Sequence, residues 1–262
     1  MERIDLGRGQ IEYARVGVPD SRADIVFLHE GLGCTAMWGS FPHVLCVAAS
    51  CRGLVYSRFG YGGSDRVARA RTDRCMHDEA LDVLPALLAR LGMGAPVLVG
   101  QSDGASIALI YAAAHPGSVS GLILEAPHVF AETLTINAIA RVRAQFAEDA
   151  VFRRKFGRYH ADATSVVEDW SAAWLAPSFR AWTIEEGLEA ITCPTLRRQA
   201  EGNPYGSLDH LHRIEARVTC PVRSVVLRGT GHAPHRDCHA RTMTEMCAFL
   251  GHLVAQVPGG GR

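Results

Sequence analysis

A serine in a tight turn flanked by glycines has the clearest potential for covalent chemistry in this chain. The apolar run 97–99 leads into Gly-Gln-Ser-Asp-Gly at 100–104, and a segment of small residues follows directly. A strand, a sharp turn and a helix in this order expose the hydroxyl of Ser102 at the edge of a sheet. This position suits a nucleophile for acyl transfer, and the next backbone N–H, that of Asp103, points to where an oxyanion would form.

A serine hydroxyl needs a base to accept its proton, and His232 is the candidate for this role. It follows the apolar segment 223–229 in a loop that contains Gly229 and Gly231. A loop directly after the last strand lies on the same sheet edge as the serine turn. This position distinguishes His232 among the 12 histidines of the chain. The neighbouring His235 is expected on the rim of the site.

A second glycine-containing loop is predicted to complete the site. His-Glu-Gly-Leu-Gly at 29–33 follows an early apolar strand. It is expected to place the Gly31 N–H beside Ser102, so that Gly31 and Asp103 form the oxyanion pair. Glu30 is expected to shape the pocket or to bind a polar group of the substrate.

Apolar segments alternate with helical patterns along most of the chain. Segments 24–28 and 119–124 are almost uninterruptedly apolar, whereas 77–91 has leucines at helical spacing and ends before Gly92. Buried strands that alternate with helices indicate an α/β protein whose mostly parallel sheet is covered on both faces. The other predicted strands are 11–17, 53–58, the apolar run 97–99 that leads into the serine turn, 193–200 and 223–229, and a last helix is predicted over 243–257.

The alternation breaks over residues 126–190, which we interpret as a helical cap inserted into a core of 1–125 and 191–257. The segment is helical in pattern and rich in tryptophan, and caps of this kind exclude water from active sites. Trp174 and His128 are predicted to line a modest apolar pocket beneath it. The alternative interpretation is that these helices simply extend the core.

Composition and charge restrict the partners of the chain. Its 262 residues are 48% hydrophobic, and 27 basic side chains balance 27 acidic ones. This balance offers no field for nucleic acid or an anionic membrane, and no apolar run is long enough to span a bilayer. The eight cysteines lack metal-ligand spacing and indicate reduced thiols of a cytoplasmic protein. The first ten residues lack the apolar region of a signal peptide, and 258–262 are predicted to be a disordered tail.

Four motifs follow one another along the chain: His-Glu-Gly-Leu-Gly at 29–33, Gly-Tyr-Gly-Gly-Ser-Asp at 60–65, Gly-Gln-Ser-Asp-Gly at 100–104 and Gly-His-Ala-Pro-His at 231–235. Together they resemble the α/β-hydrolase superfamily, and within it the bacterial small-molecule hydrolases. The similarity covers nearly the whole chain. It implies an eight-stranded, mostly parallel sheet, a helical cap, and a triad of serine, acid and histidine that needs no cofactor. It names no substrate, because esterases, lactonases, C–C bond hydrolases and peptidases share the scaffold.

The chain departs from the family pattern at two site positions and in one strand. Gln101 stands before the nucleophile, where histidine is frequent, and Asn203 stands where the triad aspartate is expected. Arg197 and Arg198 occupy strand positions that are usually apolar. Burial of these arginines is costly unless they are paired or displaced.

Three arrangements could orient His232. Glu125 ends a predicted strand on the active edge, where some relatives such as haloalkane dehalogenases carry their acid, and it is our first choice. A salt bridge from Glu125 to a cap arginine is its structural alternative. Asn203 could hold the imidazole by a neutral hydrogen bond, although an Asp-to-Asn change in serine proteases costs about 10⁴ in kcat. Glu201 or Asp209 could also reach in from the neighbouring loop.

Two functions from different classes remain open. The first is a serine hydrolase that cleaves a small ester, lactone or other acyl compound through an acyl-enzyme at Ser102, with His232 as the base. The second is a non-hydrolytic protein of the same fold, a ligand-binding or cyclase/lyase-like protein, that has lost the usual acid at Asn203. Both act on a small molecule without a metal or cofactor, nucleic acid or membrane, and the chain is expected to be a monomer or homodimer.

Overall fold

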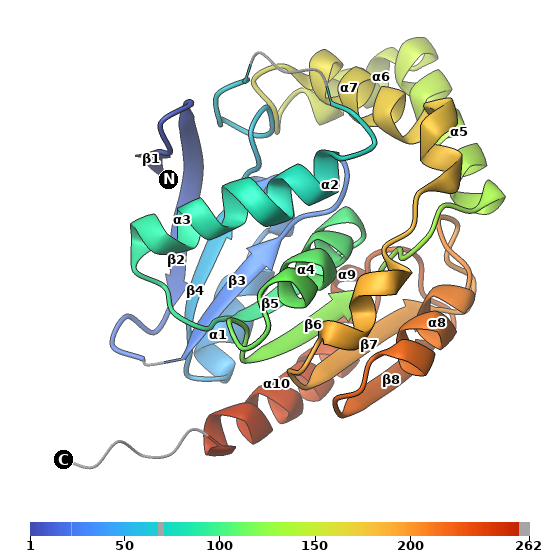
Figure 1. Ribbon diagram of the computed structural model, residues 1–262. Coiled ribbons are helices and arrows are strands. Elements are labelled where there is room, and N and C mark those ends of the chain that lie inside the picture. The colour runs from blue at the N-terminus through green and yellow to red at the C-terminus, as the bar shows by residue number, and fades with distance from the viewer. Residues whose placement is uncertain (22, 68–70, 257–262) are drawn as a thin grey trace.

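Eight strands form one sheet through the centre of the structure, a computed structural model that describes residues 1–21, 23–67 and 71–256 (Figure 1). The order is β1-β2-β4-β3-β5-β6-β7-β8. β2 runs antiparallel to both neighbours, and β3 to β8 are parallel, which confirms the predicted mostly parallel α/β sheet. The strands are β1 (Glu2–Asp5), β2 (Gln10–Gly17), β3 (Asp24–Leu28), β4 (Arg52–Tyr56), β5 (Val97–Gln101), β6 (Gly121–Glu125), β7 (Thr195–Ala200) and β8 (Val222–Leu227).

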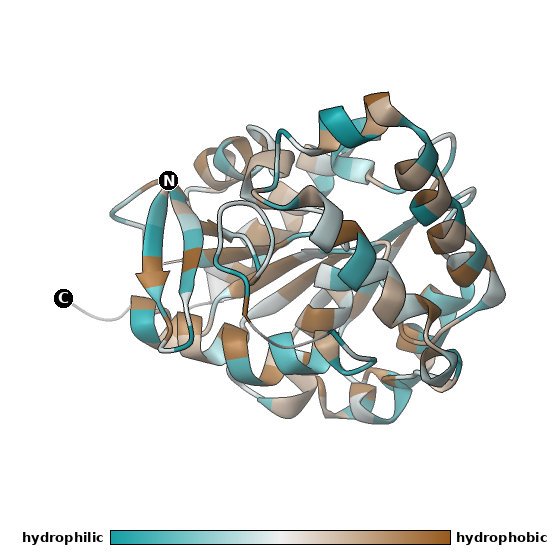
Figure 2. Ribbon diagram, turned by 90° about the horizontal axis from the view of Figure 1, so that it is seen from above, coloured by the Kyte–Doolittle hydropathy of each residue, from teal (hydrophilic) through white to brown (hydrophobic). Residues whose placement is uncertain are grey.

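Helices cover both faces of this sheet. α1 and α10 share one hydrophobic core with the strands, and α3, α4 and α8 share the other. Seen from above, the strands at the centre are largely hydrophobic, while the surrounding helices carry hydrophilic residues as well (Figure 2). The helices are α1 (Phe41–Ala48), α2 (Cys75–Asp78), η2 (Glu79–Val83), α3 (Leu84–Leu91), α4 (Asp103–Ala114), α5 (Thr133–Glu148), α6 (Ala150–Phe156), α7 (Ala163–Leu175), α8 (Asp209–Arg217), α9 (Pro234–Asp237) and α10 (His239–Gln256), with short turns η1 (Thr35–Trp38), η3 (Pro177–Ala181) and η4 (Glu185–Ala190).

The two arginines in β7 are buried because each has a charged partner. Arg198 forms ion pairs with Glu125 of β6 at 2.6 Å and with Glu245 of α10 at 3.1 Å. Arg197 pairs with Glu215 of α8. Every residue of β7 is buried, including both arginines. The ion pairs therefore allow β7 to be buried between β6 and β8, although it lacks the apolar side chains that are usual at these positions.

Three helices between β6 and β7, which we call the inserted helices (α5, α6 and α7), lie together at one end of the molecule (Figure 1). Phe130 and Thr183 form an isolated β-bridge near the two ends of this segment. Among the described helices, none is long and apolar enough to cross a membrane. The predicted tail at 258–262 lies outside the described residues.

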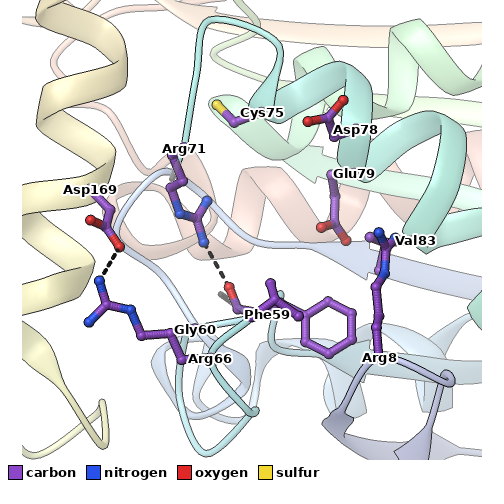
Figure 3. A pocket seen from close by; sticks show the side chains of 11 residues that line it. Arg8, Phe59, Gly60, Arg66, Arg71, Cys75, Asp78, Glu79, Val83 and Asp169 are labelled. Carbon is purple, nitrogen blue, oxygen red and sulfur yellow. Dashed lines mark hydrogen bonds and ion pairs between the residues drawn. The ribbon is translucent and has the colours of Figure 1, made fainter. Parts of the chain in front are cut away.

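Arg66 links the inserted helices to the core. Its guanidinium donates to Asp169 of α7 at 3.0 Å and contacts Asp162 and Ser165 at the start of that helix. Figure 3 shows this direct contact between Arg66 and Asp169. Both residues line a small cavity of about 100 Å³. In the same cavity Arg71 donates to the Phe59 carbonyl at 2.7 Å.

The Arg66→Ala substitution is expected to loosen α7 while changing the free energy of unfolding by less than about 1 kcal/mol, because the pair is largely exposed. Amide hydrogen exchange in the peptide covering 162–170 should accelerate. The control is Arg228→Ala, which removes an exposed pair with Glu201 beyond the ends of β7 and β8. Equal exchange of α7 in wild type and Arg66→Ala would show that the link does not hold the helix.

Candidate active site

Ser102 lies in a strained turn between β5 and α4. Its backbone has φ 53° and ψ −119°, a region that non-glycine residues rarely adopt and that costs about 1–3 kcal/mol. Two glycines make the turn possible, because a Cβ on Gly104 would collide with the Leu28 carbonyl and one on Gly100 with the backbone of Gly104. The predicted strand, turn and helix are thus present, and Ser102 lines a cavity at their junction.

The N–H groups of Gly31 and Asp103 have no hydrogen-bond partner within the described part of the chain. Trp170 of α7 lies against both residues. Its indole Nε1 donates to Asp103 Oδ2 at 3.1 Å, and the same atom packs so closely on Gly31 that a Cβ there would collide with it. An inserted helix therefore fixes the two residues whose N–H groups are available to an oxyanion.

Two buried side chains, those of His29 and Arg58, stabilise the loop that carries Gly31. His29 donates from Nδ1 to the Glu30 carbonyl at 2.8 Å, and its Nε2 accepts from the Arg58 N–H at 3.1 Å. Arg58 Nη2 also donates to the Glu30 carbonyl at 2.8 Å. Burial, reinforced by Arg58, holds the pKa of His29 well below its usual value, so the imidazole stays neutral.

His232 is oriented by Asn203. Its Nδ1 lies 2.9 Å from Asn203 Oδ1, and the same oxygen accepts from the Tyr205 N–H at 3.0 Å. A backbone N–H can only donate, so the bond from Tyr205 identifies this amide atom as the oxygen. His232 therefore carries its proton on Nδ1, and its Nε2 holds a free lone pair. This is the tautomer that a general base needs.

Burial lowers the pKa of His232 to about 4, while the charges of Glu125 and Asp237 act in the opposite direction. The ring is thus neutral and able to accept a proton over the whole physiological pH range. Tyr205 packs on it with ring centroids 4.5 Å apart. Gln101, which replaces the frequent histidine, donates from Nε2 to the His232 carbonyl at 3.2 Å.

The expectation that Glu125 orients His232 is wrong. Its carboxylate accepts from Arg198 Nη1 and from His235 Nδ1, each at 2.6 Å. The ion-pair partner is thus an arginine of β7 and not one of the cap segment. Burial alone would raise the pKa of Glu125, but the charge and hydrogen bond of His235, with Arg198, hold it below its usual value.

We expected His235 on the rim of the site, but the structure places it elsewhere. It is buried, and its ring packs against Trp38 and Phe41 at centroid distances of 4.9 and 5.0 Å. The loop acids also lie elsewhere, because Glu201 pairs with Arg228 and Asp209 with His212, all on the surface. Asn203 is therefore the side chain that the structure brings to His232.

A cavity of about 330 Å³ lies over Ser102, between the sheet edge and the inserted helices. His232 and the predicted substrate-binding residues Glu30, Trp174 and His128 all line it. Sequence reasoning missed Tyr205, although it stands two residues after Asn203 in the same short motif. The inserted helices contribute Thr135, Ile139, Val142, Gln145, Phe152, Phe156 and Trp170 to the wall.

His128 is a buried hydrogen-bond acceptor in this wall. Its Nε2 lies 2.9 Å from the Tyr205 carbonyl and must donate to it, which leaves Nδ1 unprotonated. Nδ1 is buried and has no partner among the described residues. Burial, with His210 and His232 nearby, lowers the pKa of His128 to about 3, so the ring remains neutral. Over the described residues, no three His, Cys, Asp or Glu side chains are grouped to hold a metal ion.

Comparisons with known proteins agree with this architecture. The profile of the Alpha/beta hydrolase family matches residues 25–245. Solved structures with the same fold include an esterase from Thermogutta terrifontis (18% identity, TM-score 0.73, covering 97% of this chain and 99% of that one). A carboxylesterase from Nitrososphaera gargenis has 19% identity and TM-score 0.78 over 98% of this chain and 100% of that one. A proline iminopeptidase from Mycobacterium smegmatis has 18% identity and TM-score 0.72 over 97% and 99%. No curated protein matches the sequence significantly.

Proposed function

Because the chain belongs to the alpha/beta hydrolase family, we propose that it is a serine hydrolase that cleaves a small ester, lactone or other acyl compound. One observation carries the proposal. The strained serine, a histidine with a free Nε2 and two N–H groups without partners meet around a single cavity. Its volume suits a small-molecule substrate.

The first half of the reaction forms an acyl-enzyme at Ser102. The Oγ atom attacks the substrate carbonyl carbon, and its proton passes to Nε2 of His232. The carbonyl electron pair moves onto oxygen, which the N–H groups of Gly31 and Asp103 bind. When the pair returns, the bond to the leaving group breaks, and the imidazolium gives its proton to the departing oxygen.

The second half returns the enzyme to its starting state. His232 takes a proton from water while the water oxygen attacks the acyl carbon, and the same two N–H groups bind the oxyanion again. Collapse of this intermediate releases the carboxylic acid, and Ser102 recovers its proton from His232. Asn203 keeps Nδ1 protonated throughout but offers no negative charge to the imidazolium, so the reaction is expected to be slow.

We further propose that residues 126–190 act as a lid on the cavity. The inserted helices form one of its walls, and Trp170 connects them to both oxyanion residues. Lids of this kind exclude water and complete the catalytic arrangement. The competing function, ligand binding without turnover, is favoured by the neutral Asn203 and by the low pKa of His232.

Labelling with a fluorophosphonate, read by intact mass, separates the two functions. We expect one adduct on the wild type and none on Ser102→Ala, because only an activated serine reacts. Ser120→Ala, which removes an exposed serine outside the cavity, serves as the control and should label like the wild type. A folded wild type that takes no adduct would reject the hydrolase and leave the binding function.

A further inference from the structure

The charges that line the cavity point to a more specific ligand. We propose that the cavity binds a ligand with a positively charged amino group, held by Asp103, Glu30 and His128. Under the proposed function, which this inference extends, the amino group belongs to the acyl substrate. The two ideas are separable, because the charge preference can be measured without turnover.

Asp103 places a buried carboxylate in the cavity wall, 2% exposed. The side-chain donor to it is a neutral indole, Trp170 Nε1 at 3.1 Å. No basic nitrogen lies within 4.0 Å of it in the described part of the chain. Burial raises the pKa of Asp103, although Arg58 opposes this at longer range. A charge this poorly compensated is costly, and a bound cation would offset the cost.

Glu30 adds a second carboxylate to the same cavity. Its Oε2 accepts from the Leu32 N–H at 2.7 Å, and no described cationic group forms an ion pair with it. Burial raises the pKa of Glu30, while the Leu32 hydrogen bond and the positive charge of Arg236 act in the opposite direction and the negative charge of Asp103 adds to the rise. Arg236 is the one arginine among the lining residues, but it is exposed and donates to the Met37 carbonyl at 2.9 Å.

His128 independently indicates a ligand that donates hydrogen bonds. Its buried Nδ1 is an acceptor to which no described residue donates, on a ring that stays neutral. An orphaned acceptor of this kind is rare in folded proteins unless a ligand or water satisfies it. An ammonium group has three N–H donors and no acceptor, which matches two carboxylates and one imidazole nitrogen. The tryptophans of the wall also suit a cation.

The neighbouring small cavity differs in its basic lining. There Asp169 is paired with Arg66, as Figure 3 shows, and Glu79 accepts from the Tyr56 hydroxyl at 2.8 Å. Three arginines, Arg8, Arg66 and Arg71, line that cavity, whereas Arg236 is the one described arginine that lines the cavity over Ser102.

Three 4-nitrophenyl esters of equal reach test the inference. They are the 6-aminohexanoate, the heptanoate and the mono-ester of heptanedioate, which end in ammonium, methyl and carboxylate. We expect kcat/KM for the ammonium ester to exceed that for the methyl ester at least about tenfold, because hydrogen bonds to charged groups are strong. In Asp103→Asn and in Glu30→Gln this ratio should fall toward one. The control Glu148→Gln, an exposed acid outside the cavity, should keep it.

Binding to Ser102→Ala separates this inference from the proposed hydrolysis. Titration calorimetry should show hexylammonium binding at least about tenfold more tightly than hexan-1-ol, and Asp103→Asn in the same background should remove the difference. Equal affinities, or a preference for the carboxylate ester, would overturn the inference. If hexylammonium binds selectively while none of the esters is cleaved, the hydrolase proposal fails and the charge preference stands.

Discussion

Asn203→Asp is expected to raise kcat on a cleaved ester by about 10²-fold, roughly 2.7 kcal/mol of transition-state stabilisation. The aspartate would place a negative charge 2.9 Å from His232 Nδ1, next to the imidazolium that forms during both acyl-transfer steps. We expect less than the 10⁴ seen for the reverse change in serine proteases, because part of that loss comes from the wrong tautomer. In this protein the Tyr205 N–H already enforces the correct one.

The same substitution should move the pH dependence of kcat/KM. His232 acts as a base only when neutral, and its pKa lies at about 4. Activity of the wild type should therefore stay constant above about pH 5 and fall as the pH drops through 4. A carboxylate at position 203 favours the charged imidazolium and raises this pKa, so the acidic limb should move to higher pH.

The control for this experiment is Asn203→Ala, which removes the partner of Nδ1 without adding a charge. It should lower kcat while leaving the fold intact, as judged by circular dichroism. If Asn203→Asp changes neither kcat nor the acidic limb, the residue at 203 does not act through His232. Both profiles can be measured on one 4-nitrophenyl ester by following the release of nitrophenol.

Glu125→Gln is expected to lower the free energy of unfolding at pH 7 by about 3–5 kcal/mol, since it leaves buried charge without its partner. Glu125 is fully buried between Arg198 and His235. Because the folded-state pKa of Glu125 lies below its usual value, this stability is present near neutral pH and is lost as the pH falls through that pKa.

Urea unfolding of Glu125→Gln beside Glu201→Gln provides the comparison. Glu201 forms an exposed pair with Arg228 at 3.5 Å, so its loss should stay within about 0.5 kcal/mol of the wild type. A cost below about 1 kcal/mol for Glu125→Gln would show that water or rearrangement compensates the buried charges. The two variants remove the same charge, so their difference isolates the effect of burial.

Local sequence patterns predicted the central strands well and the peripheral elements poorly. The predicted strand 24–28 coincides with β3, and the apolar run 97–99 lies within β5, because both segments are buried on two sides. β1 was missed because its four residues are largely exposed and three of them are charged. α8 was missed because its apolar stripe is narrow and most of its residues are polar.

The residues of the candidate site also differ in how well the sequence predicted them. Ser102 and Gly31 could be found because their roles depend on the backbone of short contiguous motifs. The partner of His232 could not, because β6 and β7 end side by side, with Glu125 directly opposite Arg198. Both Glu125 and Asn203 thus lie near the histidines of the 231–235 motif. Only the path of that loop decides that His232 faces Asn203 and His235 faces Glu125.

The contact of Trp170 with Gly31 and Asp103 has a consequence for timing. Under the proposed lid function, a displacement of α7 that admits a substrate would also withdraw the indole from both residues. The two oxyanion N–H groups would then be held in place only once the substrate is enclosed. Entry of the substrate and attack on its carbonyl would therefore be separate steps.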